Sequence, residues 1–142
     1  QSNVHRNTVI PLRFDERTVL QDSNGQEMVI TLRRTQRDDL PQNVPKNDCT
    51  KWFDCDKINC ELSVRTRRSG DYMIVNQSGG RKKLTRCMID DKIPGEIRQE
   101  IPLVAAKDEI LWIVGGRISE RYKITSQTEK VLEITYQGGN LE

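Results

Sequence analysis

The apolar run Ile110–Val114 (ILWIV) constrains the fold more than any other stretch of this chain. Its length and its β-branched residues are typical of a strand, and Gly115 and Gly116 end the run. Because the run shows no alternation of apolar and polar residues, it predicts a central strand that is buried on both faces. It is also the longest apolar stretch without a charge, far below the roughly 20 residues of a membrane-spanning helix. We therefore expect no membrane partner.

Shorter segments predict further strands on both sides of this run. Alternating apolar residues or short apolar runs between turn residues place them at residues 8–14, 17–21, 26–34, 50–54, 62–68, 72–75, 103–106, 121–124 and 130–136. Asn24 and Gly25 lie between two of these segments and predict a hairpin. Residues 1–7 and the tail 138–142 are polar or glycine-rich, so we expect them to be frayed or disordered.

Two short helices are expected in the middle of the chain. Leu84, Cys87 and Met88 form an apolar stripe with helical spacing, which predicts a helix over residues 80–91 that stops before Pro94. A second helix is predicted over residues 95–101, ending at Pro102. Together these elements predict an α+β fold, with mostly antiparallel β strands and two short helices.

The chain length of 142 residues favours one domain, or one domain with a small annex. Residues 36–48 are rich in proline and charge and poor in apolar residues, which is typical of a linker. We therefore predict a strand-rich lead-in over residues 1–47 and a C-terminal part over residues 48–142. Because the sequence begins at Gln1 without an initiator methionine, we expect a C-terminal piece of a longer protein.

Positive charge is concentrated in residues 65–92. This span holds eight lysines and arginines against three acids, a net charge of +5, whereas the whole chain has only +2. Strict alternation in residues 62–68 predicts that Arg65 and Arg67 point to one face of a strand. Arg81–Lys83 would occupy the first turn of the predicted helix, where cations oppose the helix dipole and a basic cluster suggests an anion-binding role. We expect one electropositive face on an otherwise near-neutral body.

No catalytic or metal site is apparent in the sequence. The four cysteines, at positions 49, 55, 60 and 87, form no C-x-x-C pair, and His5 is the only histidine. We therefore expect free thiols in a cytoplasmic protein, no catalytic residues and no metal ligands on this chain.

The order of several motifs resembles the C-terminal domain of the tRNA(Ile)-lysidine synthetase family. The matching residues are Arg65, Arg67, Arg68, Gly70 and Asp71; Gly80, Lys82, Lys83 and Leu84; Lys92, Ile93, Pro94, Arg98 and Pro102; and Trp112, Val114 and Gly116. The resemblance covers about residues 48–134. Ser69 stands where a proline is usual in this family, Thr85 where a third lysine is usual, and Met88 where an aromatic residue is usual.

This resemblance implies a role in tRNA modification. The family enzyme is a ligase that uses ATP, with Mg, to attach lysine to the wobble cytidine of the anticodon. Its catalytic domain is N-terminal, so the resemblance implies ATP and lysine for that domain and no cofactor for this one. The C-terminal domain helps to select the tRNA through the acceptor stem. The implied partners are tRNA and the N-terminal domain of the same enzyme, but not DNA; a homodimer is also open.

The resemblance and the charge pattern together assign candidate residues. The predicted RNA contacts are Arg65, Arg67, Arg81, Lys82, Lys83 and Arg98. Arg68 is expected to turn inward and pair with Asp71. Structural roles are predicted for Gly70, Asp71, Gly80, Pro94, Pro102 and Trp112, with Trp112 in the core.

Three other interpretations remain at this point. The domain is a protein-interaction or dimerisation module whose basic face meets acidic protein, with residues 52–53 and 72–75 supplying an apolar patch. Alternatively, the parent is a different tRNA-modifying ATP pyrophosphatase, such as a thiolase. The third interpretation, that this chain is itself an enzyme, lacks a paired nucleophile and base.

Overall fold

The computed structural model describes residues 2–3, 9–21, 25–43 and 49–138, which form two β-sheets and one short α-helix. The strands are β1 (Ser2–Asn3), β2 (Val9–Leu12), β3 (Arg17–Gln21), β4 (Glu27–Gln36), β5 (Thr50–Asp54), β6 (Leu62–Arg65), β7 (Tyr72–Ile74), β8 (Arg81–Lys83), β9 (Leu103–Ala106), β10 (Glu109–Ile113) and β11 (Lys130–Gly138). The helices are η1 (Arg37–Asp39), η2 (Cys55–Lys57) and η3 (Gly95–Ile97), which are 3₁₀ turns, and α1 (Leu84–Asp90).

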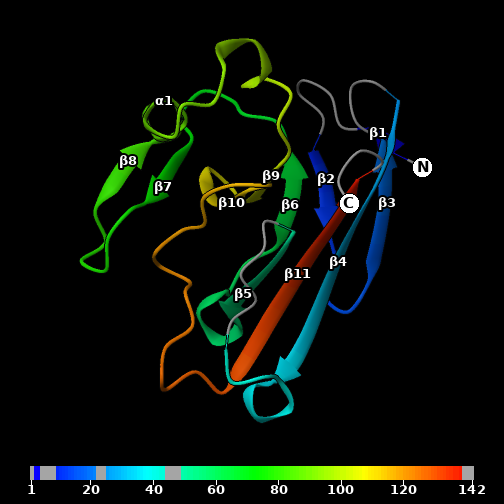
Figure 1. Ribbon diagram of the computed structural model, residues 1–142, viewed down its shortest axis with the longest axis vertical. Coiled ribbons are helices and arrows are strands. Elements are labelled where there is room, and N and C mark those ends of the chain that lie inside the picture. The colour runs from blue at the N-terminus through cyan, green and yellow to red at the C-terminus, as the bar shows by residue number, and fades with distance from the viewer. Residues whose placement is uncertain (1, 4–8, 22–24, 44–48, 139–142) are drawn as a thin grey trace.

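The first sheet has the strand order β1-β3-β4-β11-β5, and the second has the order β2-β6-β9-β10-β7-β8. Among the described strands, all neighbours are antiparallel except the pairs β1–β3 and β7–β10. Figure 1 shows β7, β8 and α1 at one end of the molecule and β3 and β4 at the other. The predicted class of mostly antiparallel strands with short helices is confirmed.

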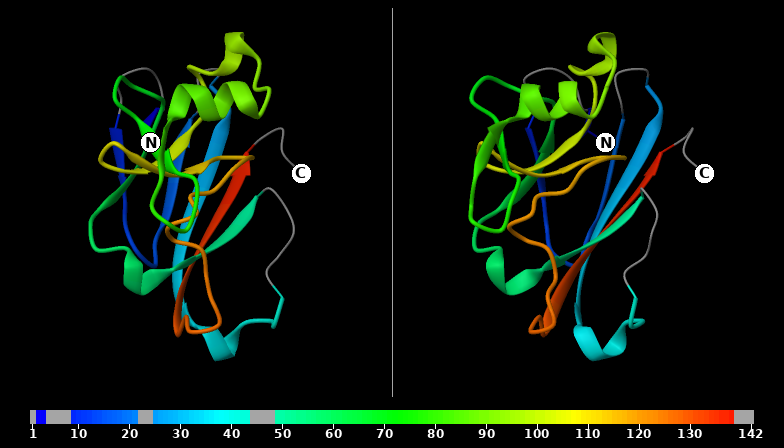
Figure 2. Two further views of the ribbon diagram at one scale, coloured as in Figure 1. Left: turned by 90° about the vertical axis from the view of Figure 1, so that its left-hand side faces the viewer. Right: turned by 60° about the vertical axis from the view of Figure 1, so that its left-hand side comes forward.

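The second sheet is covered on both faces, as the run at residues 110–114 predicts. One apolar cluster joins its strands to the first sheet, with Val64, Leu111 and Trp112 among its members. The other cluster joins its opposite face to α1 through Leu84, Cys87 and Met88, and Figure 2 shows the helix lying along this end of the molecule. The helix therefore completes the second face of the sheet.

A β-bulge in β10 explains why its apolar run does not alternate. The pairing of β10 with β9 shifts between Ile110 and Trp112. Leu111 and Trp112 consequently both belong to the cluster between the sheets, while Ile110 and Ile113 face α1. Five successive residues are thereby buried, and Trp112 has no exposed surface.

The hairpin of β3 and β4 forms as predicted, although Asn24 lies outside the described residues. Strands at residues 17–21, 50–54 and 103–106 have their predicted bounds. The expectations for the N-terminal residues and the tail lie largely outside the described residues, apart from β1 and Gly138. In the part of the chain that the structure covers, no helix is long and apolar enough to cross a membrane.

The predicted strand at residues 121–124 is wrong. Side-chain hydroxyls hold this segment in turns: Ser119 Oγ accepts from the Arg121 N–H at 3.1 Å, and Thr128 Oγ1 accepts from the Thr125 N–H at 2.8 Å. Such local bonds compete with a strand ladder. In this described segment, the Tyr122 carbonyl accepts a hydrogen bond from the Asp54 N–H of β5 at 2.7 Å, as it would in a strand pair.

Both helix predictions need correction in extent. The second helix, predicted over residues 95–101, is a single 3₁₀ turn over Gly95–Ile97. The first begins at Leu84 rather than at residue 80, because Arg81–Lys83 form strand β8.

The lead-in strands are shared between the sheets, since β2 pairs with β6 and β4 pairs with β11. The division of the chain at residue 47 stays a prediction.

Candidate nucleic-acid interface

A buried ion pair between Arg65 and Asp71 fixes the loop that joins β6 to β7. The guanidinium binds the carboxylate through two hydrogen bonds of 2.7 and 2.9 Å, and both side chains are 2% exposed. Arg65 also donates to the carbonyls of Thr66, at 3.0 Å, and Lys107, at 2.8 Å. These four bonds tie the end of β6 to the loop and to the β9–β10 turn.

The prediction that Arg65 points outward is wrong. Alternation correctly places Arg65 on the face opposite Leu62 and Val64, but this face is also covered. A period-two pattern tells which face a side chain takes and not whether another layer covers that face. With its side chain buried against Asp71, Arg65 cannot present its charge to RNA.

The predicted inward turn of Arg68 is also wrong. Its side chain is about half exposed and pairs with Asp108 at 3.3 Å. It is the Arg68 backbone N–H, and not its guanidinium, that donates to Asp71, at 2.9 Å. Sequence reasoning therefore exchanged the roles of two arginines, although both occur in the motif that carries the family resemblance.

Residues 68–71 form a tight turn that projects Arg67 and Arg68 from the sheet. The Asp71 N–H donates to the Arg68 carbonyl at 3.3 Å, and Gly70 has a φ of 93°. A left-handed third residue is the requirement of a type II turn and explains why glycine is needed there. Proline is common at the second position of this turn, which in this chain is Ser69.

Strand β8 carries the second basic cluster on a hairpin rather than at a helix start. Gly80 closes the hairpin: its N–H donates to Asn76 Oδ1 at 2.9 Å, and its carbonyl accepts from Val75 at 2.9 Å. A Cβ at Gly80 would lie 2.6 Å from the Asn76 side chain, so this approach requires glycine. The helix then starts at Leu84, whose N–H donates to the Asp71 carbonyl at 3.0 Å. The expected conflict between Arg81–Lys83 and the helix dipole therefore does not arise.

Pairing along the hairpin separates the three cations of β8 onto two faces. Arg81 lies opposite Ile74 and Lys83 opposite Tyr72, while Lys82 lies opposite the buried Met73. Arg81 stacks over the ring of Tyr72, with its guanidinium carbon 4.2 Å from the ring centre. Arg81 and Lys83 thus share one face with an aromatic ring.

Lys82 points to the opposite side, toward α1. It forms an ion pair with Asp90, and the hydrogen bond from Lys82 holds the pKa of the Asp90 carboxyl below its usual value. Arg98 is also engaged, because its Nε donates to the Ile93 carbonyl at 2.8 Å. Pro94 precedes the η3 turn, and the Pro102 carbonyl accepts from Val114 at 3.1 Å, so both lie in the connection that follows α1.

A hollow of about 430 Å³ lies between the β6–β7 loop and the start of α1. It is lined by Arg67, Arg68, Ser69, Gly70, Asp71, Tyr72, Lys83, Leu84 and Thr85. The Arg67 Nη1 atom is buried and has no hydrogen-bond partner in the described part of the chain. Together with Arg81, which stacks on Tyr72, these residues make a surface around β7 and β8, which we call the hairpin face.

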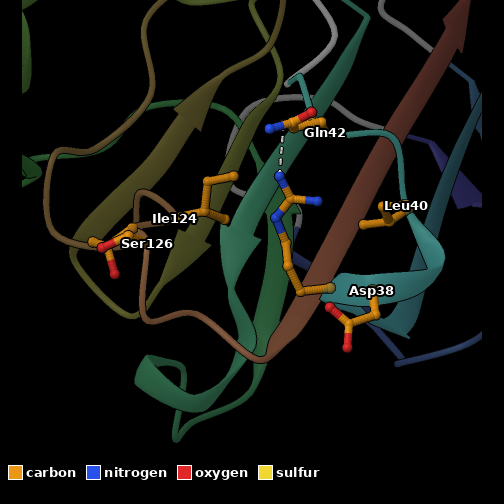
Figure 3. Close-up of a pocket in the computed structure, with 7 residues that line it drawn as sticks. Asp38, Leu40, Gln42, Ile124 and Ser126 are labelled. Atoms are coloured by element: carbon orange, nitrogen blue, oxygen red, sulfur yellow. Dashed lines mark hydrogen bonds between the residues drawn. The ribbon is translucent and has the colours of Figure 1, made fainter.

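The largest of the hollows described here contains an arginine that is already engaged. This hollow, of about 640 Å³, has Leu40 and Gln42 on one side and Ile124 and Ser126 on the other (Figure 3). Its arginine, Arg37, already donates to the carbonyls of Pro41 and Gln42 at 2.9 and 2.7 Å. The four cysteines are free, and no cluster of metal-ligating side chains occurs among the residues that the structure describes.

Comparison with known proteins relates this geometry to one family. The sequence profile of the "TilS substrate C-terminal domain" matches residues 62–134. The tRNA(Ile)-lysidine synthase of Caldanaerobacter subterraneus is 47% identical over 91 residues, and that of Clostridium perfringens is 44% identical over 93 residues. These alignments cover 64% and 66% of this chain but only 20% of each relative. A crystal structure of a TilS C-terminal domain superposes with a TM-score of 0.71 at 27% identity, covering 94% of this chain and 98% of that one.

Proposed function

This chain belongs to the TilS C-terminal domain family, the C-terminal domain of tRNA(Ile)-lysidine synthase, and on this premise we propose that it helps the enzyme to select its tRNA by binding the acceptor stem. The hairpin face is the observation that supports this proposal. Arg67, Arg81 and Lys83 gather there around an aromatic ring and a hollow. Such a surface suits RNA, whose deep major groove is closed to side chains, so that shape, phosphates and 2′-hydroxyls are read instead.

The candidate contacts contribute unequally in this proposal. Arg67 and Lys83 have no carboxylate partner in the described structure and are the principal phosphate contacts, while Arg81 offers its charge and its stack with Tyr72. Lys82 and Arg98 are secondary, because a carboxylate and a carbonyl already occupy them. Arg65 acts indirectly, by fixing the loop that carries Arg67.

The remaining parts of the activity belong to the rest of the parent enzyme in this proposal. The chain corresponds to about a fifth of the length of the relatives that it matches. ATP with Mg, lysine and the attachment of lysine to the wobble cytidine are assigned to the N-terminal domain of a cytoplasmic enzyme. This domain adds affinity for one end of the tRNA, and linkage to the catalytic domain raises the effective concentration of the anticodon at the reaction site.

A salt titration tests the proposal. Binding of the chain is measured to an isoleucine tRNA, to its acceptor-stem minihelix and to a DNA duplex of equal length. We expect the two RNAs to bind alike and better than DNA, with a log–log slope of about −3 to −5 for four to six phosphates. Equal binding of all three, or no binding, would contradict acceptor-stem recognition.

A docking or dimerisation role is the second candidate. Ile89 and Ile97, near each other in the chain on α1 and η3, are each 42% exposed. The apolar patch expected at residues 52–53 and 72–75 does not form, because Trp52, Phe53 and Met73 are buried. Dimerisation in solution that is lost on Ile89→Ser, together with salt-insensitive RNA binding, would favour this second role.

A further inference from the structure

We propose that the hollow between the β6–β7 loop and the start of α1 is a binding site for one phosphate group of the RNA, held by Arg67 and Lys83. The inference rests on the proposed function and narrows it to a single contact. The hollow lies where two segments distant in sequence, residues 67–72 and 83–85, come together.

Arg67 provides the first argument. Its Nη1 atom is shielded from solvent yet has no acceptor among the described residues. A buried guanidinium nitrogen without a hydrogen bond carries a desolvation penalty, and native structures rarely leave one so. By contrast, both Nη nitrogens of the neighbouring Arg65 are hydrogen-bonded, to two carboxylate oxygens and two backbone carbonyls. Arg67 lines the hollow, and a turn of its side chain into it would bring this nitrogen to a phosphate oxygen, in the geometry that a guanidinium binds best.

The charge balance of the hollow provides the second argument. Asp71 is the only carboxylate in its lining, and its two oxygens already accept from Arg65 and from the Arg68 N–H. Lys83 is exposed and has no ion pair in the described part of the chain. The hollow is therefore cationic, because the charge of its one lining acid is already neutralised by Arg65. The Thr85 hydroxyl adds a hydrogen-bond donor to the lining.

Three of the four cations in the neighbouring hollow are already paired with carboxylates, which distinguishes the two sites. That hollow, of about 530 Å³, lies between the β7–β8 loop and residues 120–125. Lys123 pairs there with Glu120 at 2.6 Å, and Arg121 pairs with Glu109 at 3.3 Å. Lys57 lies 3.9 Å from Asp54, and the fourth cation, Arg81, stacks on Tyr72. An anion in this hollow would therefore compete with carboxylates for three of its four cations, whereas an anion at Arg67 would displace none.

The test compares four variants of the chain in binding the acceptor-stem minihelix over a range of KCl concentrations. Arg67→Ala and Lys83→Ala remove the proposed contacts. Arg67→Lys keeps the charge but not the guanidinium, and thermal melts verify that each variant is folded. Arg17→Ala, on the exposed surface of β3 at the far end of the molecule, is the control for a general change in net charge.

We expect Arg67→Ala to lower the affinity roughly tenfold, the value of one charge-assisted hydrogen bond. It should also reduce the magnitude of the log–log slope by about 0.7 to 0.9, as should Lys83→Ala. Arg67→Lys should keep the slope and lose part of the affinity, because an ammonium cannot bind two phosphate oxygens as a guanidinium does. Arg17→Ala should change neither quantity appreciably.

Minihelices with a 5′-monophosphate and with a 5′-hydroxyl identify the source of the phosphate. If Arg67→Ala lowers the affinity for both minihelices equally, the bound phosphate is an internal phosphodiester. If it lowers the affinity only for the 5′-monophosphate minihelix, the bound phosphate is the chain end. Both results support the site. If Arg67→Ala and Arg17→Ala have the same effect, the phosphate site is wrong while RNA binding stands. If the unaltered chain binds neither minihelix, both proposals are overturned.

Discussion

Replacing Asp71 with asparagine should destabilise the domain strongly, because it leaves the buried charge of Arg65 without a partner. The pair has two hydrogen bonds of 2.7 and 2.9 Å, and each side chain is 2% exposed. Removing one member of such a pair costs roughly 3–5 kcal/mol, a large part of the 5–15 kcal/mol that stabilises an ordinary domain. At about 3 °C per kcal/mol for a chain of this size, the melting temperature should fall by roughly 10–15 °C.

Urea unfolding provides the measurement, with fluorescence of the buried Trp52 and Trp112 as the signal. The matched control is Asp15→Asn, which removes a surface carboxylate whose Oδ2 accepts two hydrogen bonds from the Arg34 guanidinium, at 2.6 and 2.8 Å. Because solvent screens exposed pairs, this control should lose far less stability.

The double variant Arg65→Met/Asp71→Leu separates burial of an unpaired charge from loss of the contacts themselves. Removing both charges should restore part of the stability, since no charge is then buried without a partner. The recovery is partial because the Thr66 and Lys107 carbonyls and the Arg68 N–H lose their hydrogen bonds. A loss below about 1 kcal/mol for Asp71→Asn, or a double variant less stable than the single one, would refute the reasoning from an uncompensated charge.

Three further outcomes follow from single side chains. Ser69→Pro should raise the free energy of unfolding by about 0.4–1 kcal/mol, since proline fits the second position of a type II turn; a decrease in urea unfolding would contradict the turn assignment. Asp90→Asn should strengthen minihelix binding, because it frees Lys82 and removes a negative charge; unchanged affinity in the salt titration would exclude Lys82 from the interface. Burial, aided by the Glu109 carboxylate, raises the pKa of Tyr122 to about 12. As the pH rises, the unfolded state therefore loses this proton first. Tyr122 should leave the free energy of unfolding unchanged below about pH 10 and should lower it between about pH 10 and pH 12. If Tyr122→Phe shows the same fall in alkaline denaturation, another group is responsible.

Strand positions were accessible from the sequence because they depend on local patterns. The alternation in residues 26–34, the turn residues beside it and the apolar run at 110–114 each report on their own segment. The pairing of β4 with β11, and the order of strands in the two sheets, depend on contacts between residues about a hundred positions apart. No local pattern contains that information.

Errors in the candidate site have the same origin. Arg65 is buried because a loop and a distant turn cover the second face of its strand, and the carbonyl of Lys107 belongs to that turn. Residues 81–83 are predicted to start a helix because the apolar stripe of α1 follows directly. In the structure, Asn76 and Gly80 close a hairpin that pairs residues 81–83 with residues seven to eleven positions earlier. The motif pointed to a segment of the chain, and the tertiary structure decides which cations of that segment reach the surface.

Strand β8 lies at the open edge of the second sheet, and this position gives its basic residues a second consequence. An unpaired edge exposes backbone groups that can extend a sheet into a neighbouring molecule, and charged side chains on the edge disfavour such association. Arg81, Lys82 and Lys83 are therefore expected to keep separate copies of the domain apart as well as to attract RNA. A sequence that exchanged them for apolar residues would become prone to aggregate, whatever its effect on the proposed RNA binding, so any loss of affinity in such a variant has to be separated from self-association.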